Sequence, residues 1–316
     1  MNMNKYMKRQ SFLTVTLAVC LFCSVQASAQ DLSTFIRCDY EGKADSLEYC
    51  FVENFLNKSK GVFWSTPNDK DKSSTYIYWQ QAHAMDVIIT AYERLTEEGR
   101  TTEAAEYKIY INRWYNNHAG NYYGSTWTNP YTDDMAWIGL TIVRIGEAFG
   151  KDSYYKMARN VYQTIAKRKK TDGTGTYLPW NTDAGAGPNA CTNSPACLVA
   201  AKLYNYYGAE KYLEYSKGLY EYVVNKIAKS DGRVEEPPLS YTQGTFGEAC
   251  RQLYLITGET KYRLMCAKVL KYAITSDRVL YKGLLRNEGS SMDQSIFKAV
   301  LIPYPVNFVL DDSYLL

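Results

Sequence analysis

Histidine is scarce in this chain, and several common catalytic and ligand-binding motifs are missing. Only two histidines, His83 and His118, occur in 316 residues. No HExxH spacing is present, and no CxxC spacing occurs beyond the N-terminal apolar run, so neither a zinc site nor a Ser-His-Asp triad is expected. The sequence also has no P-loop lysine, no GxGxxG stretch and no DxDG calcium spacing. We therefore predict that the protein needs no metal and no organic cofactor.

Long apolar runs are also missing beyond the N-terminus. The run from Phe12 to Val25 is about 14 residues, whereas a membrane-spanning helix needs roughly 20. Three basic residues precede this run, and Ala27-Ser28-Ala29 follows it, which is the pattern of a signal peptide. We predict a signal peptide over residues 1–29, one mature domain over 30–316, no membrane span, and export to the periplasm or the medium.

An excess of one charge is absent from the mature chain. The full sequence has 36 Lys+Arg and 33 Asp+Glu, and removal of the signal peptide takes away three basic residues and no acidic ones. This balance gives no reason to expect nucleic acid as a partner. Of the cysteines left after cleavage, Cys250 and Cys266 lie either side of a turn at Gly258 and are the best candidate disulfide. Buried free thiols are the alternative.

Helical periodicity, in contrast, runs through most of the chain, and strand signals are nearly absent. The apolar spacing predicts an all-α fold. The expected helices cover residues 45–57, 78–97, 101–117, 133–149, 152–168, 194–207, 210–228, 242–257, 260–275 and 293–302.

The predicted helices repeat as antiparallel hairpins. In three copies a helix ends at a glycine and a tyrosine follows four residues later: Gly150 with Tyr154, Gly208 with Tyr212, and Gly258 with Tyr262. Glycine suits the left-handed residue that closes a helix, and the short link turns the next helix back. We expect the tyrosines to pack between helices. Such hairpins stack into an open solenoid or close into a ring, and the repeat alone does not decide which.

The first helix of each hairpin is the more apolar one and should face the interior. If these helices run parallel, their starts meet at one rim, where aromatic and polar residues collect. Trp and Tyr rings suit the C–H faces and hydroxyl groups of sugars, and aromatic residues make up 15% of the chain. The candidate substrate-binding residues at this rim are Trp79, Trp127, Trp180, Asn193, Tyr241, Gln243 and Asp293.

Two adjacent carboxylates, Asp133 and Asp134, open one of the apolar helices. Aspartate is common at helix starts for structural reasons alone, because its charge meets exposed amides and the positive end of the helix dipole. The functional interpretation is that two neighbouring carboxyl groups resist ionising together, so one keeps its proton. A nucleophile and a general acid close together are what a retaining glycosidase requires.

The chain resembles glycoside hydrolase family 76, the bacterial α-1,6-mannanases. The segments that carry the resemblance are YWQQAHAMDVIITAYERL (78–95), YTDDMAWIGLTIVRIGEAFG (131–150), NSPACLVAAKLY (193–204), YTQGTFGEACRQLYLITGETKY (241–262) and DQSIFKAVLIPY (293–304). The resemblance implies an (α/α)6 barrel and a monomeric, retaining, endo-acting α-1,6-mannanase acting on α-mannan polysaccharide or oligosaccharide. It implies that Asp133 is the nucleophile and Asp134 the acid/base.

Two departures from the family pattern leave alternatives open. The stretch Gly173 to Trp180 differs from the glycine-rich stretch that usually precedes a tryptophan at the sugar site. In addition, ten helices are expected where a closed barrel needs twelve, so the last hairpin is predicted to be missing or altered. The alternatives are a catalytically impaired glycan-binding protein, a transglycosylase of the same fold, or a helical scaffold for protein partners.

Overall fold

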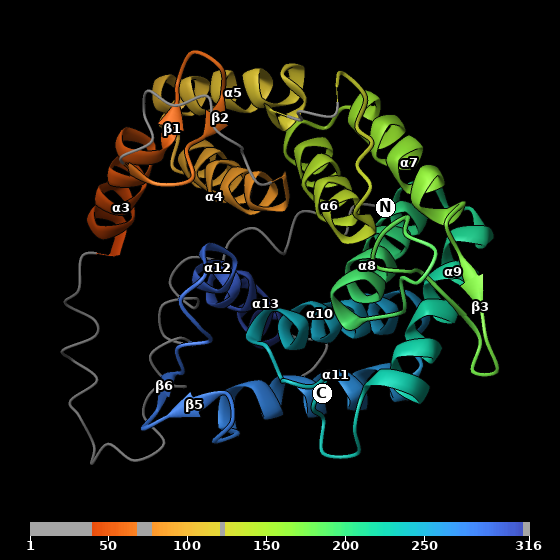
Figure 1. Cartoon of the computed structure of the whole chain (residues 1–316). Coiled ribbons are helices and arrows are strands. Elements are labelled where there is room, and N and C mark those ends of the chain that lie inside the picture. Colours follow the sequence, from red (N-terminus) through yellow and green to blue (C-terminus); the bar gives the residue numbers. More distant parts are fainter. Residues whose placement is uncertain (1–39, 68–77, 121–123, 312–316) are drawn as a thin grey trace. The chain divides into compact units, whose positions relative to one another are not determined.

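The computed structural model describes residues 40–67, 78–120 and 124–311, and these are mostly helical (Figure 1). The helices are α3 (Tyr40–Phe55), α4 (Tyr78–Glu97), α5 (Thr101–Asn116), η3 (His118–Gly120), α6 (Thr132–Phe149), α7 (Asp152–Ala166), α8 (Ala190–Tyr207), α9 (Glu210–Tyr222), η4 (Val223–Ile227), α10 (Ser240–Thr257), α11 (Thr260–Thr275), α12 (Met292–Leu301) and α13 (Pro303–Leu310). The strands form three antiparallel pairs: β1 (Leu56–Asn57) with β2 (Val62–Phe63), β3 (Lys170–Thr171) with β4 (Thr176–Tyr177), and β5 (Leu280–Tyr281) with β6 (Leu284–Leu285).

The described ranges contain no helix long and apolar enough to cross a membrane. The expected signal peptide, residues 1–29, lies outside these ranges. Its cleavage and the export of the protein therefore stay predictions.

All ten expected helices are present, and the chain continues into α13, which was not expected. Pro303 does not interrupt the helical sequence but begins α13. Proline is accepted there because a first-turn residue needs no backbone N–H donor. The last hairpin, α12 with α13, is thus present in a shortened form, and both helices pack on α10.

The glycine turns have the predicted geometry. Gly150, Gly208 and Gly258 follow α6, α8 and α10 with φ of 63°, 64° and 68°, which is the left-handed conformation. The tyrosines that follow them, Tyr154, Tyr212 and Tyr262, are buried. Each short link therefore joins an antiparallel pair, as the repeat predicts.

Two compact units divide the chain: Ser46–Ala228, and Lys229–Leu316 together with the segment before Ser46. The expectation of a single domain stays a prediction.

Within the first unit α4, α6 and α8 pack side by side, and α5, α7 and α9 each pack on the preceding helix (Figure 1). Thr141 of α6 donates to the carbonyl of Ala82 in α4 at 3.2 Å, and Cys191 of α8 donates to Asp133 of α6. The three helices run parallel, and their starts share one end.

In the second unit α10 packs closely on its neighbours. A methyl group on Gly247 would lie 2.6 Å from the Leu270 side chain, so only glycine allows α11 to approach this near. Cys250 and Cys266 are both buried in this unit, and neither forms a disulfide. The expected disulfide between them is therefore wrong for this structure, and the alternative of buried thiols holds.

Candidate active site

The start of α6 carries the two adjacent carboxylates. The residue before the helix is Tyr131, which is extended and makes no side-chain cap. Asp133 and Asp134 occupy the first turn, where the positive end of the helix dipole favours negative charge. Neither carboxylate is at the cap position itself, but both stand at the helix start, so their position alone does not separate the structural interpretation from the functional one. Groups from other segments also bond to their side chains.

The Asp133 carboxyl group is held on one oxygen only. Its Oδ2 accepts hydrogen bonds from Trp180 Nε1 at 3.0 Å and from Cys191 Sγ at 3.6 Å. Its Oδ1 is shielded from solvent and has no hydrogen-bond partner among the described residues. Burial of the charged form raises the pKa of Asp133 to about 6, against the lowering effect of the hydrogen-bond donors.

The Asp134 carboxyl group faces a different set of groups. Its Oδ2 accepts a hydrogen bond from the Nδ2 of buried Asn129 at 3.0 Å, and Asn129 Oδ1 in turn accepts from the backbone N–H of Tyr131 at 2.7 Å. Tyr78, at the start of α4, is buried, and its pKa is raised by burial and by the negative charge of Asp134. The two neighbouring aspartates thus sit in unlike environments, as two different chemical roles require.

Two irregular segments meet beside the pair and hold each other in place. The backbone N–H of Thr132 donates to the Trp180 carbonyl at 2.7 Å, and that of Thr182 donates to the Pro130 carbonyl at 3.1 Å. Arg168, just after α7, donates to the carbonyls of Asn129 at 2.6 Å and Pro130 at 3.0 Å. It also donates to Thr132 Oγ1 at 3.2 Å. One guanidinium therefore ties down the backbone that leads into Asp133.

Exposed aromatic rings lie next to the carboxylates. Trp180 is 44% exposed and Tyr131 is 38% exposed, and their ring centroids are 5.4 Å apart. Trp79 is half-buried and lies edge-on to His83, which in turn contacts Trp137. Burial lowers the pKa of His83 to about 3, so this histidine is neutral at ordinary pH. Trp180 and Tyr131 thus offer accessible apolar surface at the site, while the ring of Trp79 packs against His83.

Three of the residues expected to bind substrate are in the core instead. Trp127 is 6% exposed and packs against Trp114, Tyr115 and His118. Asn193 is fully buried, and its amide exchanges two hydrogen bonds with the Leu178 backbone, at 2.9 and 3.0 Å. Gln243 is fully buried and donates to the Val234 carbonyl at 3.0 Å. These side chains are engaged with the protein itself in this structure, and their contact with sugar stays a prediction.

Two further candidates lie in the unit formed by Lys229–Leu316. Tyr241 is half-buried and its ring lies 4.2 Å from that of Phe297. Asp293 is exposed in the first turn of α12. Their expected place at the same rim as Asp133 stays a prediction.

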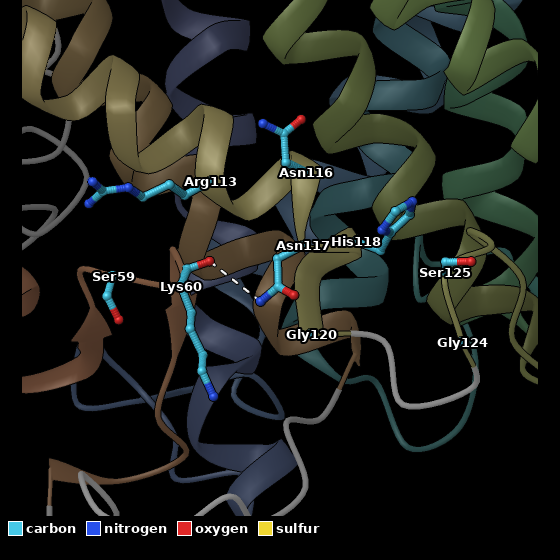
Figure 2. Close-up of a pocket in the computed structure, with 9 residues that line it drawn as sticks. All are labelled: Ser59, Lys60, Arg113, Asn116, Asn117, His118, Gly120, Gly124 and Ser125. Carbon is cyan, nitrogen blue, oxygen red and sulfur yellow. Dashed lines mark hydrogen bonds between the residues drawn. The ribbon is translucent and has the colours of Figure 1, made fainter.

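A hollow of about 720 Å³ lies at the end of α5, and none of the residues shown to hold the paired carboxylates lines it. It is lined by Ser59, Lys60, Arg113, Asn116, Asn117, His118, Gly120, Gly124 and Ser125. Figure 2 shows Arg113 and His118 on opposite sides of this hollow, with no common point on which the side chains converge. No carboxylate is among these residues, so the hollow offers no general acid or base of that kind.

Three residues at the site were not singled out from the sequence: Asn129, Arg168 and Cys191. Arg168 lies in the run KRKK, and such a basic run is typical of a solvent-exposed helix end. Asn129 lies in a polar loop and Cys191 in the first turn of α8, and the polar sequence around each does not show which way the side chain points. In the described ranges no group of three His, Cys, Asp or Glu side chains could hold a metal ion. The chemistry that the site offers is that of two carboxyl groups with unlike surroundings.

Comparison with known proteins agrees with this geometry. The chain shares its fold with the α-1,6-mannanase of Salegentibacter sp. HEL1_6, at a TM-score of 0.72 and 25% identity, over 84% of this chain and 79% of that one. The Lin0763 protein of Listeria innocua gives a TM-score of 0.73 at 24% identity, over 88% and 82% of the two chains. A mannan endo-1,6-alpha-mannosidase of Candida albicans, DCW1, is 24% identical over 205 residues.

The Candida match covers 54% of this chain and 45% of the yeast protein, so it spans less than half of that relative. The sequence profile of glycosyl hydrolase family 76, in contrast, matches residues 40–309, which is most of the chain. That span includes Asp133, Asp134 and every segment that holds them. This chain belongs to glycosyl hydrolase family 76.

Proposed function

We propose that this protein is an exported, monomeric, retaining α-1,6-mannanase that cuts within α-mannan chains. The observation that carries the proposal is the pair of adjacent aspartates at the start of α6, held in unlike environments, in a family 76 chain. A variant of the Salegentibacter mannanase in which two adjacent aspartates are replaced by alanine is inactive and was obtained in complex with α-1,6-mannotetrose. We extend that dependence on an aspartate pair to Asp133 and Asp134.

In the proposed mechanism Asp133 attacks the anomeric carbon of the mannosyl unit, and the bond to the leaving oxygen breaks. Asp134 gives its proton to that oxygen. Asp134 then takes a proton from water, which attacks the mannosyl ester and releases Asp133. With a pKa of about 6, Asp133 is mostly ionised at pH 7, as a nucleophile must be. In this scheme Asp134 supplies the proton that the first step consumes.

The exposed rings of Trp180 and Tyr131 are proposed as the sugar platform nearest the cut bond. Both are accessible, and Trp180 also touches the nucleophile through its indole N–H. Trp79 is proposed to contact the substrate along the exposed part of its ring. Tyr241 and Asp293 are proposed to bind sugar units further along the chain.

The direct test is incubation of the purified protein with unbranched α-1,6-mannan, with separation of the products by length. We expect a ladder of oligosaccharides from early times, since an endo-acting enzyme cuts internal bonds. Release of mannose alone would contradict endo action. Products longer than the substrate, formed with an added acceptor sugar, would indicate transglycosylation. Absence of any product, with retained binding to mannan, would favour the glycan-binding alternative.

A further inference from the structure

Cys191 donates to the same carboxylate oxygen as Trp180. Its Sγ lies 3.6 Å from Asp133 Oδ2, and it is half-buried and in no disulfide. A thiol is a weak donor, but a carboxylate is the acceptor for which such a bond is strongest. With two donors on one oxygen, the plane of the carboxyl group is fixed from two sides, by α8 and by the segment that contains Trp180.

The backbone that carries Cys191 is itself anchored. Asn189 caps α8 by accepting from the N–H of Thr192 at 3.0 Å. The buried amide of Asn193 donates to the carbonyls of Asn189 at 2.8 Å and Leu178 at 3.0 Å. The first turn of α8 is thereby tied to the segment that delivers Trp180. The direction of the thiol toward Asp133 follows from this anchoring.

We infer that Cys191 is a positioning residue for the Asp133 carboxylate, and that modification of its thiol switches off catalysis. This inference rests on the proposed function, because it takes Asp133 to be the group that reacts. It adds a residue and a chemical vulnerability that the paired aspartates alone do not imply.

Among the described titratable groups, Cys191 of α8 donates to Asp133 itself, and Asp134 is its neighbour on α6. The others contact residues next to the pair: Tyr78 of α4 responds to the charge of Asp134, His83 of α4 contacts Trp137, and Arg168 donates to Thr132. Tyr78 and His83 are neutral at ordinary pH, because burial raises the pKa of the phenol and lowers that of the imidazole. The bond from Cys191 favours ionised Asp133. Loss of the thiol should therefore raise the pH at which activity disappears on acidification.

Methyl methanethiosulfonate is a suitable probe of the thiol because it is small and reversible. The Cys191 thiolate attacks the sulfenyl sulfur, a disulfide to a methylthio group forms, and methanesulfinate leaves with the electron pair of the broken S–S bond. The thiol proton goes to the buffer. The modified residue has no S–H to donate, and its added group occupies space beside Asp133.

The experiment compares wild type, Cys191→Ala, Cys191→Ser and Cys50→Ser on α-1,6-mannan. Cys50 is an exposed free thiol on α3 and serves as the matched control. We expect Cys191→Ala to lower kcat/KM by roughly threefold to tenfold, with the acidic limb moved up by about half a pH unit. Cys191→Ser keeps a donor and should lose less. The reagent should inactivate wild type and Cys50→Ser, reversibly with dithiothreitol, and should spare Cys191→Ser.

Equal kcat/KM and equal acidic limbs in Cys191→Ala and wild type would overturn the inference, as would inactivation of Cys191→Ser by the reagent. A second measurement does not depend on mannan at all. The negative charge of Asp133 disfavours the neighbouring thiolate. Asp133→Asn should therefore speed methylthiolation of Cys191 several-fold at pH 8, as measured by the mass of the peptide that contains Cys191. An unchanged rate would contradict the contact. A faster rate in a protein that does not cleave mannan would leave the contact standing while the proposed function fails.

Discussion

The two ends of the helices in the Ser46–Ala228 unit are built in opposite ways. At one end α6 passes to α7 and α8 to α9 through short turns at Gly150 and Gly208. At the other end longer connections lead into α6 and α8: residues 117–120 and 124–131, which include η3, precede α6, and residues 167–189, which include β3 and β4, precede α8. A short turn only reverses the chain, whereas a long segment supplies free backbone and side chains that can be aimed. The paired aspartates and the groups that hold them are all at the end with the long segments.

The largest expected difference in kcat is between replacing a carboxylate at the end with the long segments and replacing one at the glycine end. Asp133→Asn and Asp134→Asn should each lower kcat by several orders of magnitude without a loss of melting temperature. Asp152 is the matched control, since it lies in the first turn of α7 at the glycine end and is half-buried. Asp152→Asn should leave kcat unchanged. If the α6 pair served only the helix start, its variants would lose about 1 kcal/mol of stability and keep their activity.

Arg168 tests whether the long segment must be held rigidly. Arg168→Leu removes three hydrogen bonds from the backbone between Asn129 and Thr132, so Asp133 should lose its fixed place. We expect kcat to fall by roughly tenfold to a hundredfold, because small misplacements of reacting groups are costly. Arg168→Lys should recover part of the loss, and Lys167→Leu at the exposed neighbouring position should lose nothing. If Arg168→Leu and Arg168→Lys both lose melting temperature to the same extent and both keep the wild-type kcat, the role of Arg168 is purely structural.

The pH dependence should differ in sign between the two ends. The pKa of Asp133 is raised to about 6, so the folded state favours its protonated form. The stability this gives is complete below the ordinary pKa near 3.8 and is lost as pH rises through 6. Asp133→Asn should therefore gain melting temperature relative to wild type between pH 4 and 7. The wild-type rate should fall on acidification below about pH 6.

Asp152 should behave in the opposite way. Its bond from Lys156 lowers its pKa, so the stability it gives is present above the ordinary carboxyl pKa and is lost as pH falls through the folded value. Melting curves of Asp152→Asn should approach those of wild type at low pH. Parallel pH trends for the Asp133 and Asp152 variants would contradict the contrast in their environments.

The smallest effect is expected at the glycine turns. A methyl group on Gly208 meets no atom within 4 Å, so the cost of Gly208→Ala is the left-handed backbone alone. We expect about 1 kcal/mol of lost stability by chemical denaturation and an unchanged kcat. A fall in kcat without a fall in stability would show that the glycine end also takes part in catalysis.

The sequence predicts repeated features well, because their causes are local. Helix periodicity and the glycine that closes each helix depend on neighbouring residues only, and the structure confirms them. The helix α13, which begins at Pro303, was not predicted because proline both breaks a helix interior and suits a first turn. Only the position of the preceding helix end separates these two uses.

Side-chain direction at the site was predicted less well. Asn193, Gln243 and Trp127 occur in polar, loop-flanked sequence that is equally typical of a sugar contact. What separates them is the tertiary partner: a backbone amide of Leu178, a carbonyl of Val234, and the ring of Trp114. Arg168 was missed for the converse reason, since its acceptors lie more than 30 residues away in the chain. Spacing along one sequence cannot reveal such contacts.

The most direct test of the central assignment is azide rescue of the alanine variants with a mannoside whose leaving group needs no protonation. Asp134→Ala should form the mannosyl ester and stall, and azide should then attack it to give the α-azide, because two inversions have occurred. Asp133→Ala has no nucleophile, so azide should give the inverted β product. β-Azide from Asp134→Ala with α-azide from Asp133→Ala would mean that the two roles are exchanged. Rescue of neither variant, with both folded, would contradict catalysis by this pair.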